Sequence, residues 1–341
     1  MNERPGPITI KHIAAQLGVS HSTVSRSLRD SPLIGAETKE RIRKAAIELG
    51  YVVHGAARQM RGQPSSLIGL ILPDVRPDFF SALTTTFAKA SARRGLNLLL
   101  SVSQNDAQIE EAQIRGLREA RVSGILIYPT IELTAGSRAL LAGVPTVQVA
   151  RRHPDVDATF VGTEDSKSMA TLVKHLVDLG HRRIAYIGSD PSLTPGGPRL
   201  EAFKTTLRSL DLPLDPELIA IGAATAEAGS EAAIRILTRD PRPSALAVAS
   251  APMAEGVLDI IQQMGLRVPE DLSFTGFGDP FWYRSWGPGI TSVAMPVEKV
   301  VDMALAQLLD RDPASRTTAI RIPSEVVLRG TTGRPATSSS A

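Results

Sequence analysis

From Leu67 onward the chain alternates short apolar runs with segments of helical periodicity, and this alternation restricts the fold more than any other feature. Near-continuous apolar strands between helices are typical of a parallel sheet that is covered on both faces. We therefore predict an α/β body built on parallel sheets. The first strands of this body are LIGLILP (67–73), LNLLLSVS (96–103), GILIYP (124–129) and VPTVQVA (144–150).

The alternation begins again after Gly162, which divides the body into two similar halves. The strands of the second half are RRIAYIGS (182–189), LIAIG (218–222), SALAVAS (244–250) and DLSFTGFG (271–278).

The end of the body departs from this regular order. PGITSVAMP (288–296) is followed by one more helix, 297–309, and then by the short apolar segments AIRIP (319–323) and SEVVLRG (324–330). The last residues, 331–341, are of low complexity, and we predict that they are disordered.

Length and composition describe an ordinary globular protein. A chain of 341 residues suits two or three domains, and 43% hydrophobic and 21% charged residues are unremarkable values. The absence of cysteine excludes disulfides and thiolate zinc sites. No signal-peptide run opens the sequence, and no stretch of about 18 apolar residues is present. We expect a cytoplasmic protein without a membrane partner.

Residues 8–28 read as two short helices around a tight turn. Gly18 ends the first helix and Ser20 caps the second. A solvated helical hairpin on a larger domain is the plain alternative. The outward face of the second helix offers short polar side chains and one guanidinium, which suit base edges and phosphates in a major groove: His21, Ser22, Thr23, Ser25 and Arg26.

Charge is concentrated in the same region. A third amphipathic helix, 37–49, completes a small head, and residues 1–63 hold ten Lys or Arg against five Asp or Glu. The remaining residues hold 28 against 30. A basic head on a nearly neutral body indicates a polyanionic partner for the head, and solvated helix faces are the alternative.

In this order the segments resemble the LacI/GalR family of bacterial repressors over residues 8–330. The segments that carry the resemblance are ITIKHIAAQLGVSHSTVSRSL (8–28), ELGYVVHGAARQMR (48–61), IGLILPDVRPDFF (68–80), HLVDLGHRRIAYIG (175–188), RLEAF (199–203), GLRVPEDLSFTGFGD (265–279), ITSVAMPVEKV (290–300) and SEVVLRGTT (324–332).

The resemblance implies an all-α helix-turn-helix head and an α/β two-lobed body of the periplasmic-binding-protein type. The implied domains are a DNA-binding domain at 1–53, a hinge helix and linker at 54–65, an effector-binding and dimerisation domain at 66–330 and a disordered tail at 331–341. Three crossovers would divide the body into lobe one, about 66–161 plus 291–321, and lobe two, about 162–290 plus 322–330.

By resemblance, His21, Ser22 and Arg26 carry base recognition in a double-stranded DNA operator. Arg26 can bond guanine O6 and N7 together, which is worth roughly 1–3 kcal/mol of discrimination. Four further side chains are expected to donate to phosphates: Thr9, Ser20, Thr23 and Ser25.

In the family two hinge helices of a dimer enter the minor groove and insert an apolar wedge. Met60 stands at the wedge position here, with an ordinary linker residue as the alternative. Arg58 and Arg61 flank it and should add salt-dependent affinity. Because Val53 and Gly55 depart from the family pattern, we predict a hinge that is disordered without DNA and folds on it.

The family binds a small effector between the lobes. Of the matching positions, Arg199 is the strongest, since relatives clamp the ligand with an arginine there; a surface helix arginine is the alternative. The expected effector-binding residues are Asp74, Phe79, Phe80, Arg151, Arg199, Ser250, Asp279 and Trp282.

The departures bear on the kind of ligand. Sugar-binding relatives often carry an Asn-Asp pair where this chain has Ser250-Ala251, and Asp where it has Ala150 and Gly278, while Arg151, Arg152 and Arg199 remain. We therefore hypothesise an anionic or less hydroxylated effector, such as a sugar acid. The aromatic run at 281–286 could stack on sugar or base rings, or simply pack a loop. A nucleoside or purine-type corepressor is the alternative ligand.

The sequence thus predicts a ligand-responsive repressor that binds a pseudo-palindromic operator as a homodimer, with dimer contacts along helices 79–94 and 109–121. A plain solute-binding protein with the same body is the alternative, but it would carry a signal peptide and no basic head. An enzyme is not expected, because GxxxxGK[ST], GxSxG and HExxH motifs are absent. We predict no catalytic residue, no metal and no cofactor.

Overall fold

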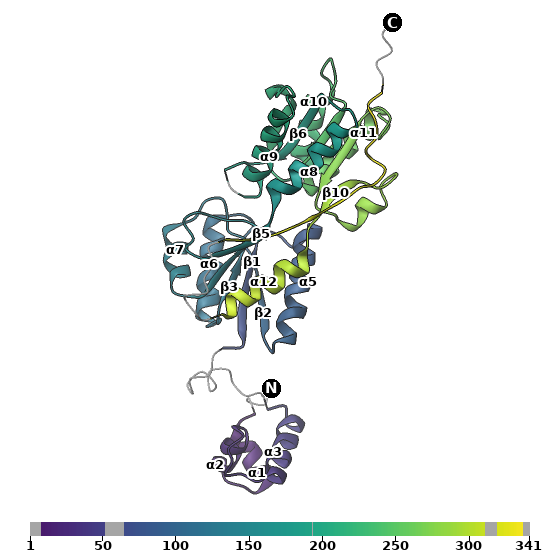
Figure 1. Cartoon of the computed structure of the whole chain (residues 1–341). Coiled ribbons are helices and arrows are strands. Elements are labelled where there is room, and N and C mark those ends of the chain that lie inside the picture. Colours follow the sequence, from purple (N-terminus) through teal and green to yellow (C-terminus); the bar gives the residue numbers. More distant parts are fainter. Residues whose placement is uncertain (1–7, 52–64, 193, 311–318, 337–341) are drawn as a thin grey trace, which may run out of the picture. The chain divides into compact units, whose positions relative to one another are not determined.

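The computed structural model describes residues 8–51, 65–192, 194–310 and 319–336. The chain divides into two compact units, Met1–Ser65 and Ser66–Ala341, here called the head and the body (Figure 1). None of the described helices is both long and apolar enough to cross a membrane.

The head is a bundle of three short helices, α1 (Ile10–Leu17), α2 (His21–Ser27) and α3 (Ala36–Glu48). Gly18 ends α1 in the left-handed conformation, at φ 64°, where glycine carries no Cβ penalty. One buried cluster joins the three helices, with Ile13, Val24 and Ile42 fully excluded from solvent. The helical periodicity of the sequence therefore produces the expected hydrophobic core of the head.

The first lobe of the body has a six-stranded sheet in the order β11-β5-β4-β3-β1-β2, and every strand pair in it is parallel. Its elements are β1 (Leu67–Leu72), α5 (Asp78–Arg93), β2 (Asn97–Val102), α6 (Ala107–Glu119), β3 (Ile125–Ile127), α7 (Ala135–Ala142), β4 (Thr146–Val149), β5 (Thr159–Thr163), α12 (Val297–Leu309) and β11 (Ala319–Ile322).

The second lobe has a sheet in the order β12-β10-β9-β8-β6-β7, parallel except for the antiparallel pair β10–β12. Its elements are α8 (Asp165–Asp178), β6 (Ile184–Ser189), α9 (Gly196–Ser209), the 3₁₀ turn η1 (Pro216–Leu218), β7 (Ile219–Gly222), α10 (Ala226–Leu237), β8 (Ala245–Val248), α11 (Ala251–Gln263), β9 (Ser273–Phe277), the 3₁₀ turn η2 (Phe281–Arg284), β10 (Thr291–Ala294) and β12 (Glu325–Val327).

Alternate strand residues face opposite sides of each sheet, and helices cover both sides. In the first lobe Leu70 packs in the cluster under α5 and α12, whereas its neighbour Ile71 packs in the cluster under α6. Figure 1 shows α12 beside α5, although the two helices are far apart in the sequence. The predicted α/β architecture with parallel, doubly covered sheets is confirmed.

Reciprocal glycines allow α10 and α11 to pack closely in the second lobe. A Cβ on Gly229 would lie 2.1 Å from the carbonyl oxygen of Met253, and one on Gly256 would lie 1.8 Å from that of Ala226. The obstructing atoms are backbone, so any larger residue would force the helices apart.

Two details correct the sequence predictions of element bounds. Helix α6 begins at Ala107 rather than 109, because the Asp106 side chain caps it by accepting hydrogen bonds from Gln108 N and Ile109 N. The lobe boundary predicted near residue 290 falls too early, because β10 is paired on both edges within the second sheet.

The prediction of disorder after residue 330 is wrong for residues 331–336. Thr331 is fully buried; its Oγ1 donates to Phe274 O and accepts from Thr291 N. Gly333 O lies 2.9 Å from Nε2 of the buried His181. The hydroxyls of a low-complexity sequence thus satisfy backbone groups of the second sheet, which the composition alone did not reveal.

Candidate functional site

The outer face of α2 presents an unpaired guanidinium among short polar side chains. His21, Ser22 and Arg26 are exposed, and no described residue forms an ion pair with Arg26. The Ser20 hydroxyl accepts a hydrogen bond from Thr23 N at 3.1 Å and so fixes the start of the helix. A rigid short helix with a free arginine and small hydrogen-bonding groups can enter a DNA groove and read base edges.

The phosphate-contact candidates have local partners. Ser20 Oγ lies 2.7 Å from Ser22 Oγ and 2.9 Å from Thr23 Oγ1, and Ser25 Oγ accepts from Arg29. Thr9 caps α1 and its N–H donates to Nδ1 of His12 at 3.0 Å. Arg58, Met60 and Arg61, with the hinge predicted around them, lie outside the described residues.

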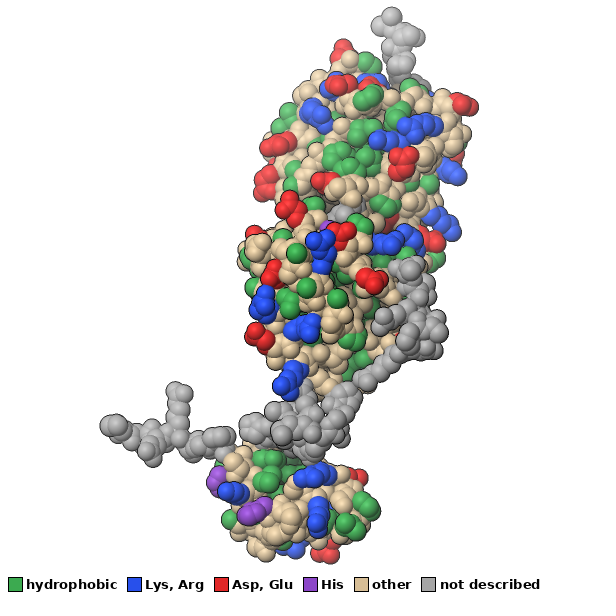
Figure 2. Space-filling model, turned by 90° about the vertical axis from the view of Figure 1, so that its left-hand side faces the viewer, with side chains coloured by type: hydrophobic (Ala, Val, Ile, Leu, Met, Phe, Trp, Pro, Cys, Tyr) green, Lys and Arg blue, Asp and Glu red, His purple; other side chains and the backbone are tan. Residues whose placement is uncertain are grey.

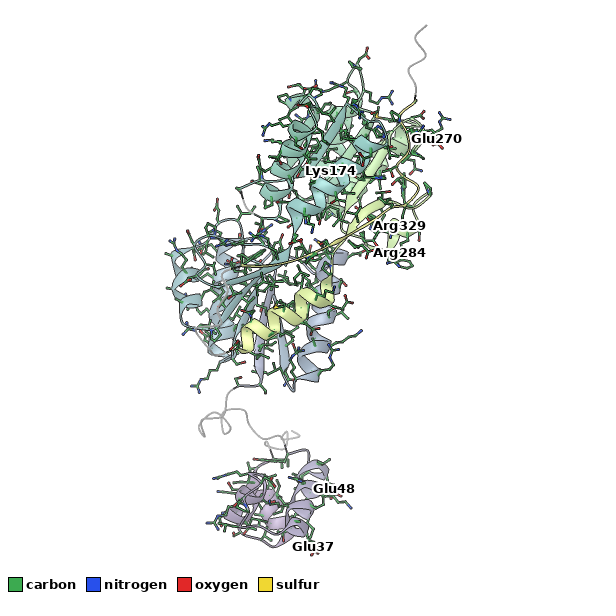
Figure 3. All side chains as sticks on the ribbon, in the orientation of Figure 1. Glu37, Glu48, Lys174, Glu270, Arg284 and Arg329 are labelled. Atoms are coloured by element: carbon green, nitrogen blue, oxygen red, sulfur yellow. The ribbon has the colours of Figure 1, made fainter. Side chains whose placement is uncertain are left out.

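Basic side chains gather on the head. On the side seen in Figure 2, Lys, Arg and His side chains of the head outnumber acidic ones. Glu37 and Glu48 mark the two ends of α3 in Figure 3. Lys39 and Arg43 are partly neutralised by Asp30, whose pKa is held below its ordinary value by the Lys39 hydrogen bond. Lys11, Arg26, Arg41 and Lys44 form no ion pair with any described residue.

A cavity of about 990 Å³ opens between the two lobes of the body. It lies where the parallel strands of both sheets end, the usual place for a ligand site in open α/β sheets. All eight residues that the sequence singled out for this cleft line it: Asp74, Phe79, Phe80, Arg151, Arg199, Ser250, Asp279 and Trp282.

On the first-lobe wall, Arg151 follows β4 and is held by neutral groups. Its NH1 donates to Asn105 Oδ1 at 2.8 Å and to Pro129 O at 3.1 Å. The guanidinium carbon lies 4.3 Å from the centroid of the Tyr128 ring. No described carboxylate is within ion-pair distance of Arg151. Its charge acts at longer range on Asp190, whose pKa is lowered mainly by hydrogen bonds with Ser192. Arg151 therefore brings an unpaired guanidinium to the cleft.

On the second-lobe wall, Arg199 in α9 is buried and already paired. Its Nε and NH2 donate to Asp165 Oδ1 at 2.9 and 2.7 Å, and its NH1 donates to Ala249 O at 2.7 Å. Its guanidinium carbon also lies 3.6 Å from the centroid of the Phe277 ring. Three of the five N–H donors of Arg199 are therefore engaged within the protein. Fewer donors remain for a ligand than a clamping arginine would offer.

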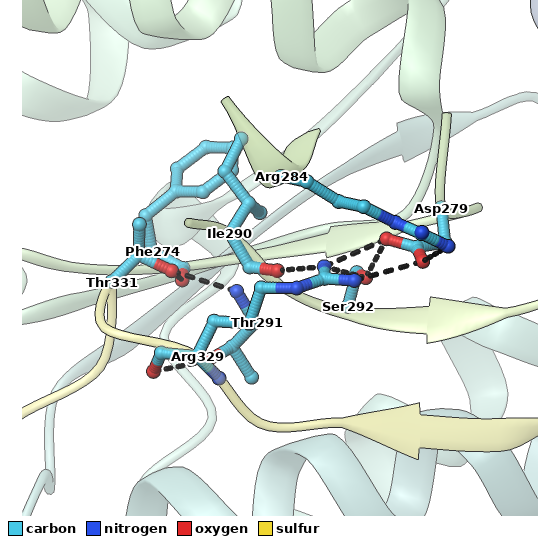
Figure 4. A network of polar contacts seen from close by, with 8 residues as sticks. All are labelled: Phe274, Asp279, Arg284, Ile290, Thr291, Ser292, Arg329 and Thr331. Atoms are coloured by element: carbon cyan, nitrogen blue, oxygen red, sulfur yellow. Dashed lines mark hydrogen bonds and ion pairs between the residues drawn. The ribbon is translucent and has the colours of Figure 1, made fainter. Parts of the chain in front are cut away.

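Asp279 is likewise engaged within the second lobe. Its two oxygens accept from Arg329 NH1 and NH2 at 2.7 and 2.9 Å, and Ser292 adds a third hydrogen bond at 3.0 Å (Figure 4). Arg284 approaches the same carboxylate at 3.6 Å, and Figure 3 shows Arg284 and Arg329 close together. Burial alone would raise the pKa of Asp279, but the hydrogen bonds from Arg329 and Ser292 outweigh it and hold the pKa low.

Three carboxylates that the sequence did not point to also line the cleft: Asp78, Asp190 and Glu255. None of them forms an ion pair with a described residue. Burial raises the pKa of Glu255, and the charge of Asp78 on the opposite lobe raises it further. Asp78 begins α5, Asp190 follows β6 and Glu255 lies in the second turn of α11; no motif marks any of them, so only the fold brings them to the cleft. Their oxygens can accept hydrogen bonds from a ligand, although they stand at other positions than the carboxylates of sugar-binding relatives.

The Asp74 carboxylate is tied to its own loop. It accepts from Val75 N at 2.7 Å and from Arg76, whose side-chain hydrogen bonds lower the pKa of Asp74 to about 2. Asp74 therefore remains ionised and shapes the loop that leads into α5.

Aromatic side chains line both walls. Phe80 packs edge-on against Tyr128 on the first lobe, with ring centroids 5.1 Å apart. Trp282 packs edge-on against the buried Tyr283 on the second lobe, whereas Phe281 is 78% exposed. The aromatic run therefore both packs its loop and presents rings to the cleft.

A hydrogen bond between described residues joins the lobes directly at the rim of the cleft. Arg152 N, on the first lobe, donates to Thr194 Oγ1, on the second, at 2.6 Å. Within the part of the chain that the structure describes, no group of His, Asp and Glu side chains could hold a metal ion.

Two family models match the chain. Residues 9–53 match bacterial regulatory proteins of the lacI family, and residues 173–332 match the periplasmic binding protein-like domain. Among curated proteins, the transcriptional regulator MalR of Streptomyces coelicolor is 32% identical over 333 residues, which cover 94% of this chain and 95% of MalR. The transcriptional repressor PurR of Haemophilus influenzae is 27% identical and covers 94% and 97%.

Solved structures agree with the fold. The Lac repressor dimer bound to operator and the anti-inducer ONPF has a TM-score of 0.85, 24% identity and coverage of 96% of this chain and 99% of that one. A LacI family transcriptional regulator from Mycobacterium smegmatis has a TM-score of 0.69, 28% identity and coverage of 79% and 100%.

Proposed function

The chain belongs to the lacI family of bacterial regulatory proteins, and we propose that it represses transcription as a homodimer on a pseudo-palindromic DNA operator. A small sugar-like or sugar-acid effector in the inter-lobe cleft would control that binding. As a DNA-binding regulator it would work in the cytoplasm at the nucleoid. The curated relatives are regulators of transcription, and the family is not one of enzymes.

The observation that carries the DNA-binding role is the exposed, unpaired Arg26 on α2. A guanidinium without a carboxylate partner is free to bond guanine O6 and N7. His21 and Ser22 lie beside it on the same exposed face, and the surplus of basic residues on the head supplies attraction to phosphates.

Footprinting on the DNA upstream of the protein's own gene tests this role. Arg26→Ala should weaken binding to the protected site by about 1–3 kcal/mol and relax its sequence preference. Lys44→Ala, which removes an exposed charge from α3, is the matched control and should leave the preference unchanged. Equal loss of affinity in both variants would contradict a base-reading role for Arg26.

The effector role rests on the chemistry of the cleft. Arg151 offers a charge-assisted donor pair for a carboxylate, while Asp78, Asp190 and Glu255 offer acceptors for hydroxyl groups. Phe79 and Trp282 offer apolar faces to a ring. A sugar acid has all three complementary features, so we favour it over a neutral sugar.

Calorimetric titration with D-gluconate, D-glucose, purine bases and nucleosides separates the ligand classes. Tight binding of a sugar acid, with loss of operator protection, would support the proposal and identify an inducer. Tight binding of a purine with increased protection would instead favour a corepressor, a role that the aromatic residues of the cleft also suit.

We expect the protein to form a homodimer whose contacts run along α5 and α6. Sedimentation of the full chain at several concentrations should give a dimer. A monomer that still footprints both halves of a palindrome would contradict it.

A further inference from the structure

Glu110 is a fully buried carboxyl group behind the first-lobe wall of the cleft. It lies in the first turn of α6, away from the cavity lining, and both of its oxygens meet the same residue. Glu110 Oε2 accepts from Thr130 N at 2.8 Å, and Glu110 Oε1 lies 3.0 Å from Thr130 Oγ1. Thr130 is also buried, so neither side chain is open to bulk solvent.

The hydroxyl of Thr130 has one proton and two oxygen neighbours. Besides Glu110 Oε1 at 3.0 Å, it lies 2.6 Å from the carbonyl oxygen of Glu132. A carbonyl oxygen can only accept, and the shorter contact takes the hydroxyl proton. The contact with Glu110 Oε1 is then a hydrogen bond only if the carboxyl group itself supplies the proton.

The surroundings of Glu110 agree with a neutral acid. Burial raises its pKa, and this outweighs the hydrogen bond from Thr130 N and the charge of Arg151, which both favour the ionised form. Other charged side chains nearby are engaged elsewhere: Glu111 turns to Thr134 and Arg115, and Arg138 of α7 pairs with Asp155. No described basic side chain forms an ion pair with Glu110.

We propose that Glu110 is a positioning residue that carries a proton: it donates to Thr130 Oγ1, accepts from Thr130 N and so fixes the segment 128–132. That segment supplies the ring of Tyr128 and the carbonyl of Pro129 that hold Arg151. A neutral acid anchors the segment without cancelling the charge that Arg151 presents to the cleft. The significance of this device rests on the proposed effector function, but its test needs neither effector nor DNA.

Replacement by glutamine separates a protonated from an ionised Glu110. A glutamine can donate to Thr130 Oγ1 and accept from Thr130 N, as the neutral acid does, whereas it cannot replace an acceptor-only carboxylate. At pH 6, where an ordinary glutamate is almost fully ionised, E110Q should unfold within about 1 °C of the wild-type full chain. At pH 8 it should unfold at the same or a higher temperature, because only the wild type can lose the proton.

Glu111, the next residue, is the matched control. Its carboxylate accepts from Thr134 Oγ1 and Arg115 and its pKa is lowered, so E111Q should lower the melting temperature at both pH values. A loss of roughly 2–4 °C or more in E110Q at pH 6, like that of an ionised acceptor, would overturn the proposal.

Two further measurements remain informative if a variant folds poorly. The infrared spectrum of the wild type at pH 6 should contain a buried carboxylic-acid band that is missing from E110Q; its absence from the wild type overturns the proposal. The Arg151 side-chain Nε–H NMR signal, assigned with Arg151→Lys, should keep its position in E110Q and shift in Glu110→Ala. An unshifted signal in Glu110→Ala would refute the positioning role.

Discussion

The first-lobe wall of the cleft holds Arg151 with a carbonyl, an amide and an aromatic ring, whereas the second-lobe wall holds Arg199 with the carboxylate of Asp165. Both arginines follow the same topological rule, since both line the cavity at the carboxyl end of a sheet. Their partners differ in charge, and that decides what each wall can do. A guanidinium held by neutral groups can still form an ion pair with a ligand. A guanidinium in a buried ion pair already has its carboxylate partner and serves the structure of its own lobe.

Breaking the Asp165–Arg199 pair should have the largest effect. Both side chains are less than a tenth exposed, so Asp165→Ala leaves a buried, uncompensated guanidinium and should destabilise the protein by about 3–5 kcal/mol. Urea unfolding followed by tryptophan fluorescence measures this loss of stability in the lobe that contains the pair, because both tryptophans, Trp282 and Trp286, lie in the second lobe.

The double variant Asp165→Ala/Arg199→Met is the control for that experiment. It removes both charges and should recover much of the lost stability. An Asp165→Ala midpoint equal to that of the wild type would mean that the pair is not a structural element of the wall.

Replacing Arg151 should have the opposite balance of effects. Arg151→Met removes contacts with neutral groups on a partly exposed wall and should cost less than about 1 kcal/mol of stability. Its affinity for the effector found by titration should fall by about 1.5–3 kcal/mol, the usual range for hydrogen bonds to a charged group. If Arg151→Met kept its affinity for the effector and lost much of its stability, Arg151 would have a structural role like that of Arg199.

The smallest expected effect is a difference in pH response between the lobes. Burial lowers the pKa of His181 and of His175, whose imidazoles contact Gly333 and Thr332 of the chain end. Because the folded pKa lies below the unfolded value of about 6.5, the unfolded state takes up protons first. The contribution of the two neutral histidines to the free energy of unfolding is therefore present at neutral pH and is lost as the pH falls below about 6.5.

In the first lobe Glu110 has the opposite sign: its pKa is raised, so its contribution is present at low pH and is lost as the pH rises. Because both histidines and both tryptophans lie in the second lobe, the urea midpoint that the tryptophans report should decrease as the pH is lowered from 7.5 to 5.5. His181→Gln and His175→Gln, tested separately, should each flatten this dependence. A wild-type urea midpoint that did not change with pH would contradict the predicted difference in pH response between the lobes.

Much of this architecture could be predicted from local sequence. Apolar runs and helical periodicity indicated the parallel sheets, and the residues that follow strand ends, such as Arg151 and Asp279, indeed line one cavity. Resemblance to a known family supplied Arg199 as a cleft residue.

The partners of these residues could not be predicted, because they come from distant parts of the chain. Asp165 lies 34 residues before Arg199, and Arg329 lies 50 residues after Asp279. Glu110 looks like any surface glutamate in QIEEAQIRGLRE, and only the fold places Thr130 against it. The buried Thr331 shows the same limit, since composition alone suggested disorder.

The order in which the strands occur along the chain has a consequence for synthesis. β11 provides one edge of the first sheet and β12 one edge of the second, and they are consecutive and late in the sequence. Domains commonly fold one after another as the ribosome releases them. In this body neither lobe has its last edge until residues 319–327 emerge, so the two lobes reach completion almost together. A ribosome that stalls before that point leaves two open sheets, both exposed to aggregation and proteolysis.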